Sequence, residues 1–401
     1  MINLFRLPLI FRLLILLAIL LNSEELCAQS KVASSKMTFG KGINFTSSDS
    51  LFTMQINGRV QTMFEARNNL NTNQLGGDFL LRRCRINLQG TALDPRFTYR
   101  IQIGFAHGDI SAANSQEVNN LILRDAMLFY QAKKWLRLGF GQTKLPGNRQ
   151  RQVSSANLQL VERSVANNNF TLDRDKGFWV YSNFNIKKSV IKSTIAVSSG
   201  EGRIISNRNG QMSVSGRLEL LPFGSFTNNG DYIEGDQERE QKPKLSIAAV
   251  YNYNKGASRT MGQLGEYLSS GATTDIRYYG VDLLFKYRGF SLASEWYNRD
   301  AGTLVFSDPT DPTMRNTIIS GTGFFVQSGY MVTQKNEIAL RYAHINPNEK
   351  IANIMPSQQE YVLGFSHYFF KHSLKLQTDL SYQKIRNSEN LIYRLSGVVS
   401  F

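Results

Sequence analysis

Arginine and lysine are the residues of this sequence whose types and spacing could do chemistry. The chain carries 46 Lys and Arg against 31 Asp and Glu, a formal net charge of +15. Many of the basic residues occupy alternate positions in short apolar–polar repeats, on the same phase as other polar side chains. The arginine charge is permanent, and its planar guanidinium can hold an oxyanion through two parallel hydrogen bonds. The pattern therefore points to chemistry with small anions.

Basic residues outnumber acidic residues on this polar phase by eleven to six. The basic residues are Arg59, Arg83, Arg85, Arg100, Arg137, Lys192, Arg217, Lys286, Arg341, Lys375 and Arg394. The acidic residues are Glu65, Asp125, Glu219, Asp282, Glu295 and Asp379. Around a narrow water column with apolar walls, such a surplus sets an ion preference. Nucleic-acid binding is not expected, because it uses cations gathered in one patch or helix. The alternative is that basic residues at the rim of the barrel contact the phosphates of lipopolysaccharide.

Alternation of apolar and polar residues over about ten positions predicts half-apolar β-strands. In FTYRIQIGF, for example, Phe97, Tyr99 and Ile101 alternate with polar residues. Sixteen such segments occur along the chain. They cover residues 52–66, 79–93, 97–105, 121–130, 135–143, 177–186, 190–199, 212–221, 244–254, 276–288, 290–298, 322–332, 336–344, 360–370, 373–383 and 391–401.

The joints between these strands differ in length according to whether they follow an even-numbered or an odd-numbered strand. Most joints after even-numbered strands are tight, as at Lys133-Lys134 and Arg288-Gly289, whereas most joints after odd-numbered strands are long loops rich in Gly, Asn and Ser. The joint after the eighth strand, residues 222–243, is a long acidic exception. Short turns at one rim and long loops at the other are typical of outer-membrane barrels. We therefore predict an all-β, 16-stranded antiparallel transmembrane β-barrel over residues 52–401.

The apolar phase of the predicted strands continues to the last residue, Phe401. We expect this phase to face outer-membrane lipid, and the last strand to pair with the first, because closure removes the sheet edges. A secreted β-sandwich would also alternate. Aromatic residues at the strand ends, such as Tyr130 and Trp135, and the polar opposite phase favour the barrel, with water on its inner side.

The first residues are expected to direct export. Two arginines precede the apolar run 13–21, and Ala28 stands before a polar residue, which is typical of a cleaved secretory signal. We therefore predict a signal peptide over 1–28, a periplasmic segment over 29–51 and a location in the cell outer membrane. Cys84 is the one cysteine of the mature chain, so no intramolecular disulfide is expected.

The segment 144–176 breaks the alternation most clearly. It is the third joint on the long-loop side, the place at which many sixteen-stranded porins fold a loop inward, and we expect it to narrow the channel. An ordinary exposed loop is the alternative. The segment carries six cations and three acids, namely Lys144, Arg149, Arg151, Arg163, Arg174 and Lys176, with Glu162, Asp173 and Asp175.

Six short motifs, in this order along the chain, resemble the phosphate-selective porin O/P family. They are GRVQ at 58–61, RRCRINLQG at 82–90, LRDAMLFY at 123–130, GQTKLP at 141–146, ERS at 162–164 and DRDKG at 173–177. The resemblance implies a homotrimeric sixteen-stranded channel with an arginine-rich path for small anions such as phosphate. Two positions depart from the family pattern: Gly147, where phenylalanine is usual, and Leu172, where proline is expected. The family positions that carry over are Arg59, Arg83, Arg85, Lys144, Arg163 and Arg174.

The predicted anion pathway adds to these the strand residues Arg100 and Arg137 and the loop residues Arg149 and Arg151. No cofactor, metal site or enzyme activity is expected, because none of the four histidines shares a readable motif with an acidic or serine partner. A general porin, an oligosaccharide porin and an adhesin are the alternatives. An oligosaccharide porin would use aromatic residues inside the lumen, and Trp179, Tyr181 and Tyr297 fall on the polar phase.

Overall fold

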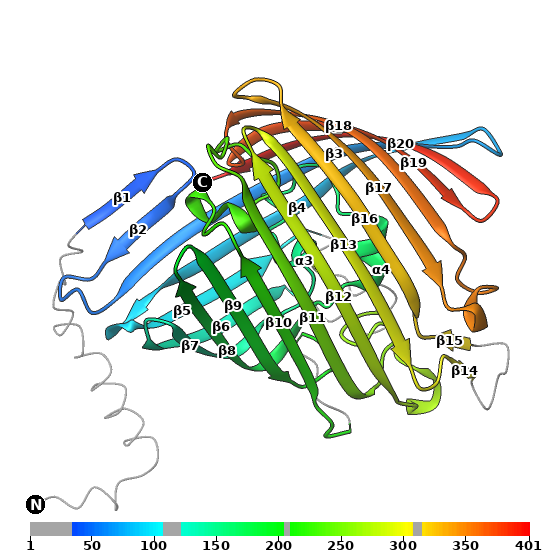
Figure 1. The fold of residues 1–401 in the computed structure, drawn as a ribbon, viewed down its shortest axis with the longest axis horizontal. Coiled ribbons are helices and arrows are strands. Elements are labelled where there is room, and N and C mark those ends of the chain that lie inside the picture. Colours follow the sequence, from blue (N-terminus) through cyan, green and yellow to red (C-terminus); the bar gives the residue numbers. More distant parts are fainter. Residues whose placement is uncertain (1–33, 107–121, 204–208, 308–314) are drawn as a thin grey trace, which may run out of the picture.

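Hydrogen bonds between neighbouring strands close the chain into a barrel (Figure 1). The computed structural model describes residues 34–106, 122–203, 209–307 and 315–401. Within these ranges, sixteen antiparallel strands pair in sequence order, and β20 pairs with β3 to complete the ring. The strands of the ring are β3 (Thr53–Asn69), β4 (Gln74–Ala92), β5 (Asp94–Gly104), β6 (Leu123–Lys133), β7 (Leu136–Lys144), β8 (Arg174–Ile186), β9 (Ser189–Ser198), β10 (Ser213–Leu221), β11 (Lys244–Ala257), β12 (Thr274–Tyr287), β13 (Phe290–Ala301), β16 (Gly321–Met331), β17 (Asn336–Pro347), β18 (Gln358–Phe370), β19 (Leu374–Ile385) and β20 (Ser388–Ser400).

The seam between β20 and β3 is paired from Asn390 to Ser400. Just beyond it, the Phe401 amide donates to the Gly58 carbonyl at 3.0 Å, and the Gly58 amide donates to the Phe401 carbonyl at 2.8 Å. A Cβ atom on Gly58 would lie 2.3 Å from the Phe401 ring, so the ring occupies the space that the glycine leaves free. This contact explains why the alternating pattern continues to the last residue.

The predicted barrel is confirmed, and each of the sixteen predicted segments overlaps a strand of the ring. Two joints after odd-numbered strands, the first and the fifteenth, are shorter than the gaps between the predicted segments. β3 and β4 run on to a tight hairpin at residues 70–73, and β19 and β20 meet at residues 386–387. Asn73 and Arg386 adopt left-handed backbone angles, φ 52° and 53°, which let the chain reverse within a few residues. The joint between β13 and β16 also carries a small ribbon of β14 (Val305–Ser307) and β15 (Arg315–Thr317).

The two faces of the wall follow the predicted phases. Apolar side chains such as Leu363 on β18 and Leu395 on β20 are exposed on the outer face, whereas Gln377 and Arg394 are buried on the inner face. Exposed aromatic rings gather at the rim with the short turns. Phe97 packs on Tyr130 at 4.8 Å between ring centroids, and Trp135 stacks on Phe184 at 5.1 Å. Such an aromatic girdle marks the membrane–water boundary in outer-membrane barrels.

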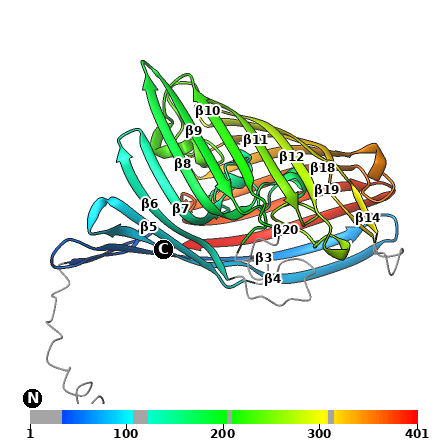
Figure 2. The same ribbon diagram turned by 90° about the horizontal axis from the view of Figure 1, so that it is seen from below.

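A hairpin of β1 (Ser34–Thr38) and β2 (Gly42–Thr46) extends the wall at the short-turn rim (Figure 2). β2 pairs with the first residues of β3, Thr53 to Ile56, beside the place where β20 ends. The hairpin lies inside the predicted periplasmic segment. The predicted signal peptide, 1–28, lies outside the described residues. No helix in the described part of the chain is long and apolar enough to cross a membrane.

Neighbouring residues on β9 offer a test of the two faces. Ile195 is 52% exposed on the outer face, and Thr194 lines the cavity inside the barrel. Arginine on the lipid face near the bilayer middle costs about 2–4 kcal/mol. We therefore expect Ile195→Arg to lower the unfolding free energy by roughly this amount, and Thr194→Arg to change it by less than about 1 kcal/mol. Denaturant titration in lipid vesicles measures both. Equal losses would mean that the faces are assigned wrongly.

Candidate functional site

The barrel lumen is filled on one side by the chain that joins β7 to β8. This segment, residues 145–173, contains α3 (Arg149–Gln152) and α4 (Val165–Phe170), and it lies inside the ring (Figure 1). Ser164 caps α4 by accepting a hydrogen bond from the Asn167 amide at 3.0 Å. α4 packs on β13, β16, β17 and β18, across the lumen from its own strands.

An apolar core holds the segment against the wall. Its wholly buried members include Leu145 and Phe170 of the segment, and Trp179, Tyr297 and Phe325 of the wall. Burial of large apolar and aromatic side chains is worth about 1.5–3 kcal/mol each. The segment is therefore an integral part of the barrel. Trp179 and Tyr297 are buried beneath the segment and offer no surface to a sugar. Of the three aromatic residues that an oligosaccharide porin could have used, only Tyr181 lines the cavity.

The tip of the segment is tied to β19. The Val161 amide donates to the Asp379 carboxylate at 3.1 Å. The carbonyl of Gln159 accepts from the Gln377 side chain at 2.9 Å, and Lys375 donates to the carbonyl of Leu158 at 2.7 Å. These bonds carry the chain from β7 to the opposite wall.

The acidic joint 222–243 also folds into the lumen, from the short-turn rim. It contains a short 3-10 helix, η3 (Thr227–Tyr232), and buries Asp231, Glu234, Asp236 and Glu240. The Glu234 amide donates to the Asn157 carbonyl at 2.9 Å, and the Glu234 carboxylate accepts from the Gln159 amide at 2.9 Å. The two inward segments therefore meet and support each other.

A buried charge cluster joins both inward segments to the wall. The Arg149 guanidinium donates to Asp282 at 2.8 Å, to Ser246 at 2.6 Å and to the carbonyl of Asp231 at 2.8 Å. Glu219 lies 3.3 Å from Arg149, and Arg217 binds Asp282 at 2.5 Å. We call Arg149, Arg217, Glu219 and Asp282 the latch cluster. Its two cations and two carboxylates balance, as buried ions must.

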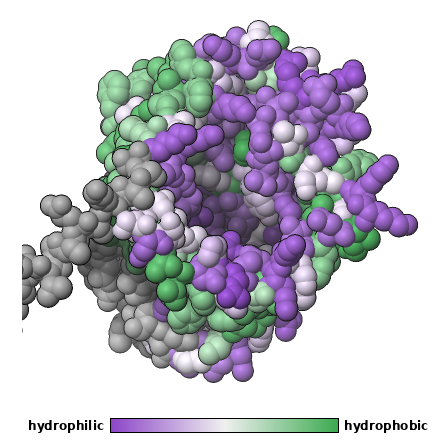
Figure 3. Space-filling model, turned by 90° about the vertical axis from the view of Figure 1, so that its left-hand side faces the viewer, coloured by the Kyte–Doolittle hydropathy of each residue, from purple (hydrophilic) through white to green (hydrophobic). Residues whose placement is uncertain are grey.

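The other side of the lumen is hollow. A cavity of about 910 Å³ lies between the inward segments and the wall of β4 to β10. Viewed from the left-hand side of Figure 1, the molecule is hollowed at its centre, with hydrophilic residues around the opening (Figure 3). Among the described residues, fourteen basic and four acidic side chains line the cavity. The basic ones are Arg82, Arg83, Arg85, Arg100, Arg124, Lys134, Arg137, Lys144, Arg151, Arg163, Arg174, Lys192, Arg203 and Arg217. The acidic ones are Asp125, Glu162, Asp173 and Glu219.

Eight of the ten residues of the predicted anion pathway come together at this cavity. They are Arg83, Arg85, Arg100, Arg137, Lys144, Arg151, Arg163 and Arg174. The other two do not reach it. Arg149 belongs to the latch cluster. Arg59 donates to the Ser155 hydroxyl at 2.9 Å, and Arg85, which does line the cavity, donates to the same oxygen at 3.2 Å.

Arg82 lies at the cavity although strict alternation places it on the outer phase. The pairing of β3 with β4 shifts register between Gln61 and Thr62, and such a bulge re-aims the neighbouring side chains. Arg82 and Arg83 therefore both reach Glu162, at 2.5 and 3.1 Å. Burial alone would raise the pKa of the Glu162 carboxyl, but the two arginine charges outweigh burial and hold the pKa well below its usual range.

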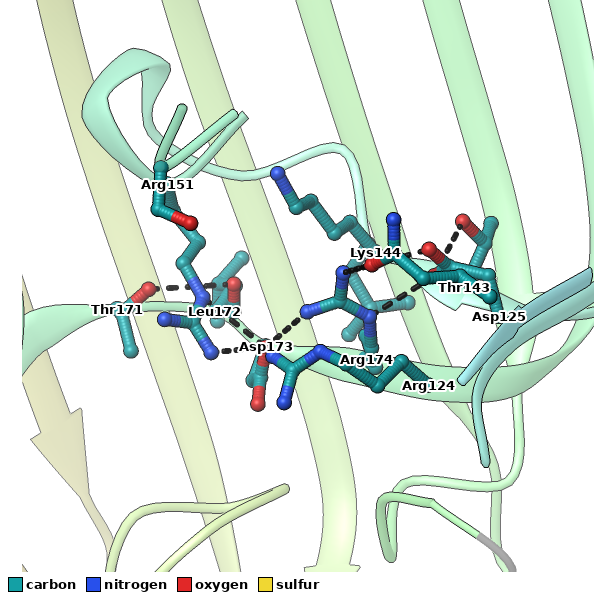
Figure 4. Close-up of polar contacts among 12 residues, drawn as sticks. Arg124, Asp125, Thr143, Lys144, Arg151, Thr171, Leu172, Asp173 and Arg174 are labelled. Atoms are coloured by element: carbon teal, nitrogen blue, oxygen red, sulfur yellow. Dashed lines mark hydrogen bonds and ion pairs between the residues drawn. The ribbon is translucent and has the colours of Figure 1, made fainter. Parts of the chain in front are cut away.

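Two carboxylates organise the arginines at the end of the inward segment. Arg151 and Arg174 converge on Asp173 (Figure 4), with Arg174 at 3.5 Å. Arg174 also donates to Asp125 at 2.8 Å, and Arg100 lies 3.8 Å from the same carboxylate. With two carboxylates among three arginines, the group keeps a positive excess.

Other cations at the cavity contact uncharged acceptors. Arg137 donates to the Thr98 hydroxyl at 3.0 Å, and Lys144 donates to the carbonyl of Gln152 at 2.8 Å. No carboxylate offsets their charges through these bonds. A neutral acceptor carries no net charge that would cancel the charge of the donor group.

Arg163 stabilises the fold of the inward segment through hydrogen bonds to the backbone of the same segment. It donates to the carbonyls of Gln150 and Val153 at 2.8 and 2.9 Å. Burial, with the neighbouring charges of Arg151 and Arg83, lowers the pKa of Arg163 well below its ordinary value. Its side chain is committed to the fold of the segment at the edge of the cavity.

A second cavity, of about 590 Å³, extends toward the N-terminal hairpin. Phe45 of β2 and Tyr99 of β5 line it, and Arg100, Phe129 and Arg137 line both cavities. The hollow side of the lumen therefore continues to the short-turn rim. In the described ranges, no group of three or more His, Cys, Asp and Glu residues could hold a metal ion.

The comparisons with known proteins agree with this architecture. No curated protein matches the chain. Among solved structures, the chain is similar to OmpF of Salmonella typhi in complex with daunomycin (12% identity, 88% of this chain and 98% of that one, TM-score 0.55). It is also similar to the anion-selective porin from Comamonas acidovorans (12% identity, 87% and 100%, TM-score 0.54). A third similar structure is the outer membrane channel DcaP of Acinetobacter baumannii (11% identity, 87% and 97%, TM-score 0.53). At these identities the likeness concerns the fold.

A family model for phosphate-selective porin O and P matches residues 54–393, which is nearly the whole ring of strands. Porins of this kind are channels of the outer membrane rather than enzymes. The chain belongs to the phosphate-selective porin O and P family.

Proposed function

We propose that this outer-membrane channel favours small anions, which pass through the hollow side of the lumen. The observation that carries the proposal is the lining of the larger cavity, with fourteen basic residues against four acidic ones. Low-dielectric walls focus the field of such a lining, and few water molecules screen it. A cation that enters this space meets a repulsive potential along most of its path.

The spacing of the cations supports conduction rather than tight capture. Arg83 and Arg85 of β4 stand on one wall, and Arg100 and Arg137 lie where the two cavities join. A row of moderate sites lets an anion enter and leave, whereas a single cage would hold it. Inorganic phosphate is the solute we favour, because the arginine fork matches its oxygens and because the family carries that description.

The residues of the proposed pathway divide into two groups. Arg83, Arg85, Arg100, Arg137, Lys144, Arg151 and Arg174 present charge to the solute. Arg59, Arg149 and Arg163 hold the inward segment in place. Homotrimer formation, contact with lipopolysaccharide and cleavage after Ala28 remain parts of the proposal that the family resemblance and the sequence supply.

The double variant Arg100→Gln/Arg137→Gln tests the pathway. Removal of two charges at the junction of the cavities should lower the ratio of anion to cation permeability by at least about twofold. The reversal potential of single channels across a KCl gradient measures this ratio. The matched control, Lys350→Gln/Lys384→Gln, removes two exposed charges at the other rim and should leave the ratio unchanged.

Addition of phosphate to the same channels tests the solute. Phosphate should block part of the chloride current in the unmodified protein, and this block should weaken in the double variant. A cation-selective unmodified channel would overturn the proposal. Anion preference without a phosphate block would make the protein a general anion-preferring porin.

The latch cluster is tested by Arg149→Ala. The loss of Arg149 leaves Arg217 as the one cation between the buried carboxylates of Glu219 and Asp282. An uncompensated buried charge costs about 3–5 kcal/mol, so we expect the inward segments to loosen at this part of the wall. Single-channel conductance should rise, while the outer wall stays folded. The matched control is Arg277→Ala, on the exposed phase of the same strand as Asp282. Unchanged conductance in Arg149→Ala would show that the cluster does not hold the segments.

A further inference from the structure

We propose that the short-turn rim binds the phosphate head groups of anionic phospholipids in the leaflet that surrounds it. Nine cations in the joints of this rim or next to them are exposed, and we call them the basic rim. They are Arg96, Lys133, Lys134, Lys187, Lys188, Lys242, Arg288, Lys335 and Lys371. Lys134 also borders the larger cavity, whereas the other eight do not line it.

Few carboxylates offset the basic rim. Asp94 and Glu238, which are partly buried, bind Arg96 and Lys371 at 2.9 and 2.5 Å. Among the described residues, the exposed acid at this end is Asp49. The opposite rim is nearly balanced, with seven exposed cations and five exposed acids in the described ranges. Its cations are Arg67, Lys255, Arg277, Arg315, Lys350, Lys384 and Arg386, and its acids are Asp78, Glu266, Asp275, Asp300 and Glu349.

The cations stand at the level where lipid head groups begin. The Arg96 guanidinium lies 5.8 Å from the centre of the Tyr130 ring, and the Arg288 guanidinium lies 5.2 Å from that of Tyr287. Lys134 precedes Trp135 in the chain, and Trp135 belongs to the aromatic girdle. Aromatic rings occupy the membrane–water interface, so charges packed on them or next to them reach the phosphates.

Turn geometry does not account for the basic side chains. Lys187, Arg288 and Lys371 adopt left-handed backbone angles, with φ of 52°, 49° and 45°. Glycine or asparagine fits this conformation with less strain than a long side chain does. Three long cations therefore occupy positions where the backbone alone would favour a small residue, as Arg386 does at the opposite rim.

A lipid partner fits this arrangement better than a dissolved one. Eight of the nine cations of the basic rim do not line the larger cavity, whereas the proposed solute path runs inside the barrel. Charges attract an anionic surface only within about a Debye length, roughly 10 Å at 0.1 M salt. Cations at head-group level meet that condition along the whole rim.

Quenching of Trp135 by brominated lipids provides the test. The full chain with Trp296→Phe is reconstituted into vesicles that contain either brominated phosphatidylglycerol or brominated phosphatidylcholine. Trp179 is wholly buried, so the quenching that depends on the lipid reports on Trp135. Trp135 is 45% exposed, stacks on the exposed Phe184 and also borders the larger cavity. We expect phosphatidylglycerol to bind at least about threefold more strongly than phosphatidylcholine at low salt, and the preference to vanish in 1 M salt.

The triple variant Lys133→Gln/Lys187→Gln/Lys188→Gln, in the same background, should lose this preference. The matched control Lys255→Gln/Lys350→Gln/Lys384→Gln removes three exposed charges at the opposite rim and should keep it. Equal quenching by the two lipids in the parent protein would overturn the proposal. So would a preference that survives in the triple variant, because the charges would then have no part in it.

Discussion

A chain that crosses a hydrocarbon layer must pair every backbone N–H and C=O group within itself. Here that constraint is met at the seam, where β20 lies against β3 and the ring of sixteen strands has no free edge. The other properties of the molecule follow from this closure. A ring of that many strands is too wide for its own side chains to fill, so the interior must hold water, further chain or both.

The lumen of this barrel contains both further chain and space for water. Residues 145–173 and 222–243 fill one side of the lumen, and water-accessible space remains on the other. The filled side resembles the interior of a soluble protein, with an apolar core around Phe170 and Phe325 and a balanced charge cluster around Arg149. The hollow side carries the unbalanced charge. The contacts that stabilise the interior and the residues of the proposed anion pathway thus lie on different sides of the lumen.

The sequence predicts the wall well, because a period of two is a local property that each strand displays by itself. It also predicts the lining wherever a strand is regular, as at Arg100 and Arg137. It fails at Arg82, where a bulge breaks the period, and at residues 70–73, where the polar hairpin looks like a loop. The role of residues 222–243 could not be predicted either, since it depends on contacts with Asn157 and Gln159, far away in the chain.

The contacts of the inward segment also bear on the order in which the molecule folds. Gln159 and Gln377 are 218 residues apart in sequence, and so are Val161 and Asp379. Contacts between such distant positions form late, because the intervening chain must first be ordered. The tip of the segment, residues 158–161, can therefore reach its final contacts only after β19 has joined the sheet. We therefore expect the interior of this barrel to be completed after the wall has closed, and a closed wall whose inner segment has not yet settled would be a wider channel than the final one.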